Sequence, residues 1–187
     1  MQRAIQSLHQ LLQEVDLSKE EPMIRGTYAG TFDPPTNGHL DIILRSLQFC
    51  NELVVGIGIN PNKITMFDEE ERIDLLQGIL SSMANIKITS FQGLLVDYAK
   101  QIDAGILIRG TRSVSDFEYE INLSNVNKVL APSIETVFLP TSPELAIVSS
   151  SMVKQIASFG GDISKFVPKN VETAIKSKLG FVKFGDR

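Results

Sequence analysis

The sequence predicts an α/β fold: a doubly wound sheet of five parallel strands with helices on both faces. From residue 23 onward, short apolar segments rich in β-branched residues alternate with segments of helical period. The segment 52–59 is apolar throughout, as expected for a strand that is buried on both faces. Strict alternation of strand and helix favours a parallel sheet with right-handed crossovers. A chain of 187 residues is long enough for one such domain.

The first half of the domain is predicted to contain three strands and three helices. The strands cover 24–28, 52–59 and 86–90, and a short third helix covers 94–101. The first helix carries apolar residues on one face at i, i+3, i+4 and i+7: Leu40, Ile43, Leu44 and Leu47. The second helix opens at Asp68, which resembles the start of a capping box closed by Glu71. It bears a further apolar set: Ile73, Leu76, Leu80 and Met83.

The second half is predicted to contain two more strands and three helices. The strands cover 105–108 and 135–139, the first of them ending at Arg109-Gly110. The helices cover 116–130, 150–158 and 168–179. Together these elements describe a Rossmann-like domain.

Two short segments flank this domain. The domain is expected to span 23–180, with a tail over 181–187 and an amphipathic extension over 1–22 whose apolar residues recur at helical spacing: Ile5, Leu8, Leu12 and Val15. The extension lacks the apolar stretch of a secretory signal and is too acidic for a transit peptide. No apolar run approaches the ~20 residues that span a membrane. We therefore expect a protein without a membrane partner.

Charge and cysteine content narrow the function classes. The net charge of −4 argues against a nucleic-acid binder, because affinity for a phosphate backbone needs clustered surplus cations. The single cysteine, Cys50, cannot form an internal disulfide and is expected to fill the core in a reducing compartment. Because the chain carries no surplus of positive charge, any affinity for phosphate must come from a local pocket.

The loop over 30–39, between the first strand and the first helix, indicates phosphate binding. It holds two hydroxyls, two glycines and an imidazole where the amides of a helix N-terminus are unpaired and the helix dipole favours an anion. Other nucleotide motifs are excluded. Gly56-Ile57-Gly58 lies inside a strand, with Pro61 where the third glycine of a dinucleotide fingerprint belongs. The chain contains no P-loop, zinc-ligand cluster or serine nucleophile elbow.

Candidate phosphate ligands follow four of the predicted strands. The carboxyl ends of parallel strands share one edge, and ligands bind there where the winding reverses. If the first and fourth strands are neighbours, the loop over 31–39 faces Arg109-Gly110-Thr111-Arg112. Lys63 follows the second strand and Ser149-Ser150-Ser151 follows the fifth, so both open on the same edge. Three cations, an imidazole and two helix N-termini predict a polyphosphate site.

These segments resemble those of bacterial phosphopantetheine adenylyltransferases over about 24–179. The resemblance rests on runs beginning at Tyr28 (YAGTFDP), Thr36 (TNGH), Asn60 (NPNK), Arg109 (RGTRSVSDFEYE) and Ser149 (SSS). Thr-x-Gly-His alone marks only the wider nucleotidyltransferase superfamily, whereas the run at Arg109 is much more specific. The resemblance implies that ATP and 4′-phosphopantetheine react, with Mg²⁺, to give dephospho-coenzyme A and pyrophosphate. It also implies a cytoplasmic homohexamer subject to feedback by coenzyme A.

The same resemblance assigns catalysis to His39 and Lys63. His39 would donate to an α-phosphate oxygen, and Lys63 would contact the phosphate and the transition state. A place in the first helical turn disfavours the cationic form of His39, whereas a bound triphosphate favours it, so the sequence leaves its protonation state open. The nucleophile is the phosphate of the substrate itself. Catalysis should therefore consist of positioning and charge stabilisation.

The resemblance also implies the binding residues, without a protein metal site. Contacts to 4′-phosphopantetheine would be Thr31, Lys63, Leu95 and Arg109. Contacts to ATP would be Thr31, Phe32, His39, Gly110, Thr111, Arg112, Glu120, Leu145, Ala146, Ile147, Val148, Ser149, Ser150 and Ser151. A structural role alone could also explain several of these residues. Arg112 could form an ion pair with Asp116 or Glu120, Ser149 to Ser151 could cap a helix, and Leu95 could pack in the core.

The sequence departs from the family pattern near the nucleotide. Ala29 stands where proline is usual, and Pro35 where an aliphatic residue is common. The run Leu145-Ala146-Ile147-Val148 replaces an aromatic, a serine, an aromatic and isoleucine. That run borders the nucleotide, so affinity for ATP can differ even if the reaction does not.

Three alternatives remain. A nicotinate-mononucleotide adenylyltransferase or a glycerol-phosphate cytidylyltransferase would share Thr-x-Gly-His but not the run from Arg109 to Glu120. A non-catalytic nucleotide-binding module would be expected to have lost His39 or Lys63, and both are present. A purely structural module is disfavoured because candidate phosphate ligands recur at four strand ends.

Overall fold

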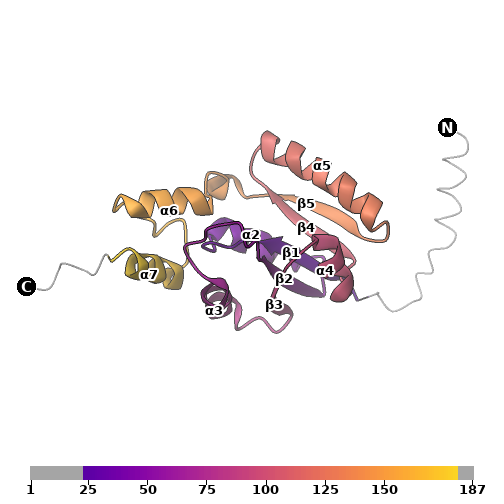
Figure 1. Ribbon diagram of the computed structural model, residues 1–187, viewed down its shortest axis with the longest axis horizontal. Coiled ribbons are helices and arrows are strands. Elements are labelled where there is room, and N and C mark those ends of the chain that lie inside the picture. The colour runs from indigo at the N-terminus through magenta and orange to yellow at the C-terminus, as the bar shows by residue number, and fades with distance from the viewer. Residues whose placement is uncertain (1–22, 181–187) are drawn as a thin grey trace, which may run out of the picture.

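A computed structural model describes residues 23–180 as one parallel sheet with helices on both faces (Figure 1). The five strands run in the order β3-β2-β1-β4-β5. They are β1 (Arg25–Gly30), β2 (Glu52–Gly58), β3 (Ile86–Phe91), β4 (Ile106–Thr111) and β5 (Glu135–Pro140). The helices are α2 (Asn37–Ser46), α3 (Glu69–Leu80), α4 (Leu95–Gln101), α5 (Val114–Leu130), α6 (Ser150–Ser158) and α7 (Lys169–Lys178). The predicted doubly wound, Rossmann-like fold is confirmed, while the expected extension over 1–22 and tail over 181–187 lie outside the described residues.

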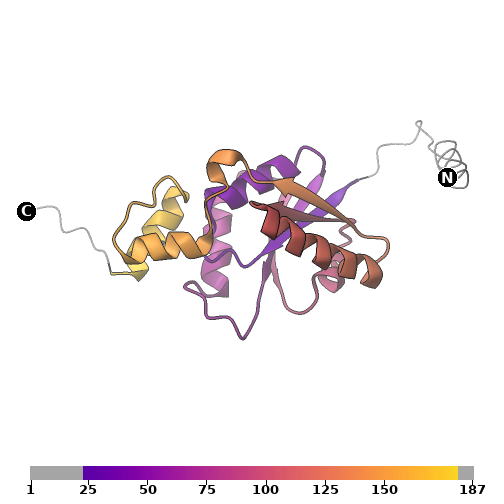
Figure 2. The same cartoon turned by 90° about the horizontal axis from the view of Figure 1, so that it is seen from above.

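Apolar side chains of the sheet are buried under helices on each face. α2 and α3 pack on one face, where Ile42 and Leu76 join Ile108 in a buried cluster. α4 packs on the opposite face, where Val96 meets Leu107. Figure 2 shows α2 and α5 on opposite sides of the sheet. Burial on both faces explains why the central strands lack polar alternation.

A second core lies beyond the carboxyl edge of the sheet. There α6 and α7 pack against α3 through buried residues that include Val153, Ile175 and Leu75, together with Phe67 of the loop before α3. In Figure 1 both helices lie beyond the ends of the strands. This packing places the N-terminus of α6 next to the loop that follows β1.

The structure corrects several element boundaries and one helix face. β4 continues to Thr111, so Arg109-Gly110-Thr111 is strand and not loop, because β5 pairs with β4 along its whole length. β1 continues to Gly30, which pairs with Ile57. In α2 the buried face centres on Ile42, whereas Leu44, predicted on the apolar face, is 46% exposed. This difference arises because α2 packs on both β2 and β4, and these contacts fix the rotation of the helix about its own axis. A 3₁₀ turn over Pro143–Leu145 (η1) has no counterpart among the predicted elements.

Local signals in the sequence hold in three dimensions. The predicted capping box of α3 is present: Glu71 N donates to Asp68 Oδ1 over 2.9 Å, and Asp68 N donates to Glu71 Oε2 over 2.8 Å. Cys50 is buried in the core as expected. Its sulfur would lie 2.7 Å from a Cβ added at Gly26, so glycine is needed for this packing. Within residues 23–180, no helix is long and apolar enough to cross a membrane.

Candidate active site

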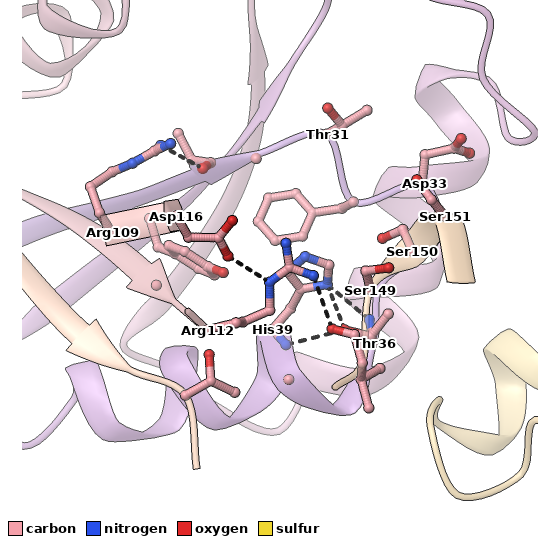
Figure 3. A pocket seen from close by; sticks show the side chains of 18 of the residues that line it. Thr31, Asp33, Thr36, His39, Arg109, Arg112, Asp116, Ser149, Ser150 and Ser151 are labelled. Atoms are coloured by element: carbon pink, nitrogen blue, oxygen red, sulfur yellow. Dashed lines mark hydrogen bonds and ion pairs between the residues drawn. The ribbon is translucent and has the colours of Figure 1, made fainter. Parts of the chain in front are cut away.

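A pocket of about 430 Å³ opens between the carboxyl ends of β1 and β4, where the winding of the sheet reverses (Figure 3). The loop after β1, the N-termini of α2 and α6, the end of β4 and the start of α5 form its walls. Twelve of the predicted site residues line it: Thr31, Phe32, His39, Lys63, Arg109, Gly110, Arg112, Glu120, Val148, Ser149, Ser150 and Ser151. The topology therefore brings together residues from four strand ends, as the predicted sheet order requires.

A capping box at the start of α2 positions the imidazole of His39. Thr36 is the N-cap residue, and its hydroxyl accepts from His39 N over 3.4 Å. In return, the backbone N–H of Thr36 donates to His39 Nδ1 over 3.0 Å. Phe32, which is 1% exposed, packs edge-on against the imidazole with ring centroids 5.1 Å apart. The ring is thus fixed from two sides, as Figure 3 shows for the contacts with Thr36.

These contacts determine which nitrogen of His39 carries the proton. Nδ1 accepts a hydrogen bond, so the proton of the neutral ring is on Nε2. Burial and, to a smaller extent, the neighbouring Arg112 guanidinium together lower the pKa of His39 from 6.5 to about 4. The protein without ligand therefore presents a neutral imidazole at pH 7, with Nε2–H as a hydrogen-bond donor.

The depressed pKa of His39 predicts an acid-dependent loss of stability. Below pH 6.5 the unfolded chain binds a proton at this residue that the folded protein does not bind until about pH 4. The free energy of unfolding should therefore be highest above pH 6.5 and fall toward pH 4, by up to about 1.4 kcal/mol per pH unit. Urea denaturation at several pH values would measure this slope. His39→Ala should flatten it, and equal slopes in both proteins would contradict the shifted pKa.

Lys63 and Arg72 converge on the first residue of the loop after β1. Lys63 is exposed, and its Nζ donates to Thr31 Oγ1 over 3.0 Å. Arg72 of α3 is only 4% exposed and donates from Nη1 to the Thr31 carbonyl oxygen over 3.0 Å. It also donates from Nε to the Asp68 carbonyl oxygen over 3.0 Å. The backbone at Thr31 is therefore held from α3, while its hydroxyl faces a cation at the pocket.

The two predicted arginines are each paired with a carboxylate of α5. Arg109 Nε and Nη2 both donate to Glu120 over 2.7 Å, and Nη1 donates to the Ala29 carbonyl oxygen. Arg112 Nε donates to Asp116 over 3.1 Å (Figure 3). The ion pair that competed as an explanation of Arg112 is thus present with Asp116, while Glu120 orients Arg109. Each guanidinium has five N–H groups, so both retain donors that can face a ligand.

A buried ion pair joins α6 to the loop after β1. Asp33 is 2% exposed and accepts from Lys154 Nζ over 2.6 Å. It also accepts from the backbone N–H groups of Met66 and Phe67, over 3.0 and 2.8 Å. Burial raises the pKa of Asp33, but these hydrogen bonds outweigh it and hold the pKa below its usual value. Asp33 therefore stays charged and fixes the end of the loop that carries Lys63.

The serine run has both structural and pocket-facing members. Ser149 is the N-cap of α6, where its Oγ accepts from Met152 N over 3.1 Å. Ser150 Oγ donates to the Pro34 carbonyl oxygen over 2.8 Å. Both hydroxyls thus organise the backbone at the N-terminus of α6, an end of a helix that favours an anion. All three serines line the pocket.

Five predicted contacts do not line the pocket: Leu95, Thr111, Leu145, Ala146 and Ile147. Leu95 and Leu145 pack against buried clusters, which favours the core explanation for Leu95. Thr111 is 7% exposed, and its carbonyl oxygen accepts a hydrogen bond from Thr141 N. Ile147 is 65% exposed beyond the pocket wall. Of the run that departs from the family pattern, only Val148 faces the pocket.

The pocket also contains side chains to which the sequence analysis assigned no contact with a substrate. They are Tyr28, Asp33, Thr36, Asp116, Tyr119, Thr141 and Lys154. Two of them carry a signal that could have found them. Thr141 follows β5 at the same sheet edge, and Lys154 lies one helical turn beyond Ser150 on the same face of α6.

Comparisons with known proteins agree with this site. A family model described as cytidylyltransferase-like matches residues 27–156. The phosphopantetheine adenylyltransferase of Lachnoclostridium phytofermentans is 48% identical over 153 residues, which are 82% of this chain and 94% of that protein. Among solved structures, a Vibrio parahaemolyticus protein described as a candidate nicotinate-nucleotide adenylyltransferase superposes with a TM-score of 0.62 at 17% identity. That match covers 83% of this chain and 93% of the other, and at this identity it speaks for the fold alone.

Proposed function

Since the chain belongs to the cytidylyltransferase-like family, and within it to the phosphopantetheine adenylyltransferases, we propose that it transfers the adenylyl group of ATP to 4′-phosphopantetheine. The products are dephospho-coenzyme A and pyrophosphate. The observation that carries the proposal is the convergence of His39, Lys63, Arg109 and Arg112 on one pocket at the switch point of the sheet. Such a pocket suits two phosphorylated substrates.

In this reaction a phosphate oxygen of 4′-phosphopantetheine attacks the α-phosphorus of ATP. A new P–O bond forms, the bond from the α-phosphorus to the oxygen that bridges it to the β-phosphate breaks, and pyrophosphate leaves with the electron pair. The nucleophile is already an anion, so the protein needs no strong base. Its task is to hold two anions in line and to stabilise charge on the α-phosphate oxygens.

The neutral imidazole of His39 suits that task. Its Nε2–H would donate to an α-phosphate oxygen, and the ring cannot rotate away because Nδ1 is held by Thr36 N. Lys63 is close enough to Thr31 for both to contact the same phosphate. Arg109 would hold the phosphate of 4′-phosphopantetheine, and Arg112 with the first turn of α6 would hold the β- and γ-phosphates of ATP.

We further propose that Mg²⁺ enters with ATP, as the counterion of the triphosphate. The three carboxylates that line the pocket, Asp33, Asp116 and Glu120, are each engaged in an ion pair with a lysine or arginine. Phosphate oxygens and water are common ligands of Mg²⁺ in such sites. The pocket residues thus fit a metal carried by the substrate better than a resident metal.

A pyrophosphate-release assay on the full chain tests the function. ATP and CTP would each be offered with 4′-phosphopantetheine, nicotinate mononucleotide and glycerol phosphate. We expect pyrophosphate only from ATP with 4′-phosphopantetheine. Product only with one of the other acceptors would overturn the assignment.

Replacement of Lys63 by alanine should reduce kcat/KM by about 10- to 100-fold, the typical value of a hydrogen bond to a charged group. The side chain is exposed, so the free energy of unfolding should change by less than about 0.5 kcal/mol. Steady-state kinetics and urea denaturation measure the two effects. Lys87→Ala is the matched control, because Lys87 is also exposed but pairs with Glu52 at the opposite edge of the sheet. Equal kinetics for both variants would remove Lys63 from the site.

We also propose that the protein assembles as a homohexamer in the cytoplasm and is inhibited by coenzyme A. None of the residues of α5 is buried, and its exposed apolar side chains include Val114, Val126 and Val129. An apolar face of this kind typically marks a subunit interface. Sedimentation equilibrium should give the mass of six chains.

Coenzyme A contains the phosphopantetheine and adenylyl parts of the product, so it should compete with both substrates.

A further inference from the structure

Tyr28, on the central strand β1, has a hydroxyl that forms no hydrogen bond with any other group of residues 23–180 and is accessible from the pocket. The residue is 8% exposed and lines the pocket. Tyr98 makes a useful contrast, because it is 4% exposed and its hydroxyl lies 2.5 Å from Thr89 Oγ1. A hydroxyl that protein groups leave unpaired, on a ring held at the wall of a pocket, is free to donate to a ligand bound there.

The sheet register places this hydroxyl beside the backbone that links the two arginines. Tyr28 pairs with Ile108 of β4, and Gly110 lies two residues further on the same face. A Cβ added at Gly110 would lie 3.4 Å from the Tyr28 hydroxyl oxygen and 3.0 Å from Ile42. The glycine therefore makes room for the tyrosine ring. The hydroxyl reaches the part of the pocket between Arg109 and Arg112.

The charged groups around the hydroxyl leave it without an acceptor. The nearby guanidinium groups of Arg109 and Arg112 have only donors to offer. The two nearby carboxylates are already engaged, Glu120 by Arg109 and Asp41 by Arg45 and Ser142. Burial raises the pKa of Tyr28 to about 12, although the two arginines oppose the shift. The hydroxyl therefore keeps its proton at neutral pH.

We propose that Tyr28 is a further catalytic residue, whose hydroxyl donates a hydrogen bond to a phosphate oxygen bound between Arg109 and Arg112. The inference rests on the proposed adenylyl transfer and adds a donor to the set formed by His39 and Lys63. Its ring is held in place by edge-on packing on Phe32, with centroids 5.6 Å apart. The donor is therefore preorganised before the substrate binds, which is the condition under which such groups accelerate a reaction most.

The test compares Tyr28→Phe with Tyr98→Phe in the full chain. Each variant removes one tyrosine hydroxyl and keeps the ring. Tyr28→Phe should lower kcat/KM with ATP and 4′-phosphopantetheine by about 10- to 100-fold. Its midpoint of urea denaturation without ligand should not fall, because no protein hydrogen bond is lost. Tyr98→Phe should show the reverse: a lower midpoint, since Thr89 loses its partner, and wild-type kinetics.

Wild-type kinetics in folded Tyr28→Phe would overturn the proposal. A lower kcat/KM together with a lower midpoint of urea denaturation would also overturn it, because the hydroxyl would then be structural. Failure of the proposed function looks different, since the wild-type protein itself would release no pyrophosphate from these substrates.

Discussion

Replacement of His39 by alanine is expected to lower kcat by about 10²- to 10³-fold, the usual cost of removing one donor from developing negative charge. The imidazole is neutral, its Nε2–H is free to donate, and its position is fixed by Thr36 and Phe32. A side chain whose position was less firmly fixed would stabilise the transition state less. Single-turnover pyrophosphate release measures the effect on the chemical step.

Loss of stability must be separated from loss of catalysis in this variant. His39→Ala removes half of the capping box of α2, which should cost about 0.5–2 kcal/mol and leave the protein folded. His39→Glu is the matched control, because Thr36-x-x-Glu is itself a capping box but offers no N–H at neutral pH. Both variants should be nearly inactive. Turnover close to wild type in either folded variant would refute the role of His39.

The largest loss of stability is expected from Lys154→Met, at about 3 kcal/mol, because breaking a buried pair leaves an uncompensated charge. Asp33 is 2% exposed and would keep only the N–H groups of Met66 and Phe67 as partners. Its pKa should rise in the variant, since the Lys154 ammonium helps to hold it low. Urea denaturation at pH 7 measures the change.

Two control variants test whether the loss of stability in Lys154→Met comes from the burial of Asp33. Lys100→Met removes an exposed partner of Asp97 and should change the free energy of unfolding by less than about 1 kcal/mol. The double variant Asp33→Asn with Lys154→Met should recover part of the loss, because no buried carboxylate remains. If Lys154→Met is as stable as Lys100→Met, the pair does not hold α6 against the loop after β1.

Much of the site could be predicted because strand ends of a parallel sheet share one edge. That rule brought Thr31, His39, Lys63 and Arg112 together before any coordinates. The contacts that the family resemblance implied for Leu145 and Ile147 are not at the pocket, because Leu145 packs against a buried cluster and Ile147 is exposed to solvent. The direction of a side chain in an irregular segment depends on packing that no local pattern records.

The sequence by itself determined the alternation of strands and helices, the capping box of α3 and the placement of two hydroxyls and an imidazole around the start of α2. These depend on residues within about four positions of one another, so local periodicity and composition suffice. Only the tertiary structure decided which carboxylate pairs with which arginine, that Lys154 reaches Asp33 across 121 positions, and that Tyr28 lines the same pocket as both arginines. Such choices follow from burial and from how separate elements pack, where one unpaired polar group costs as much as several favourable contacts contribute.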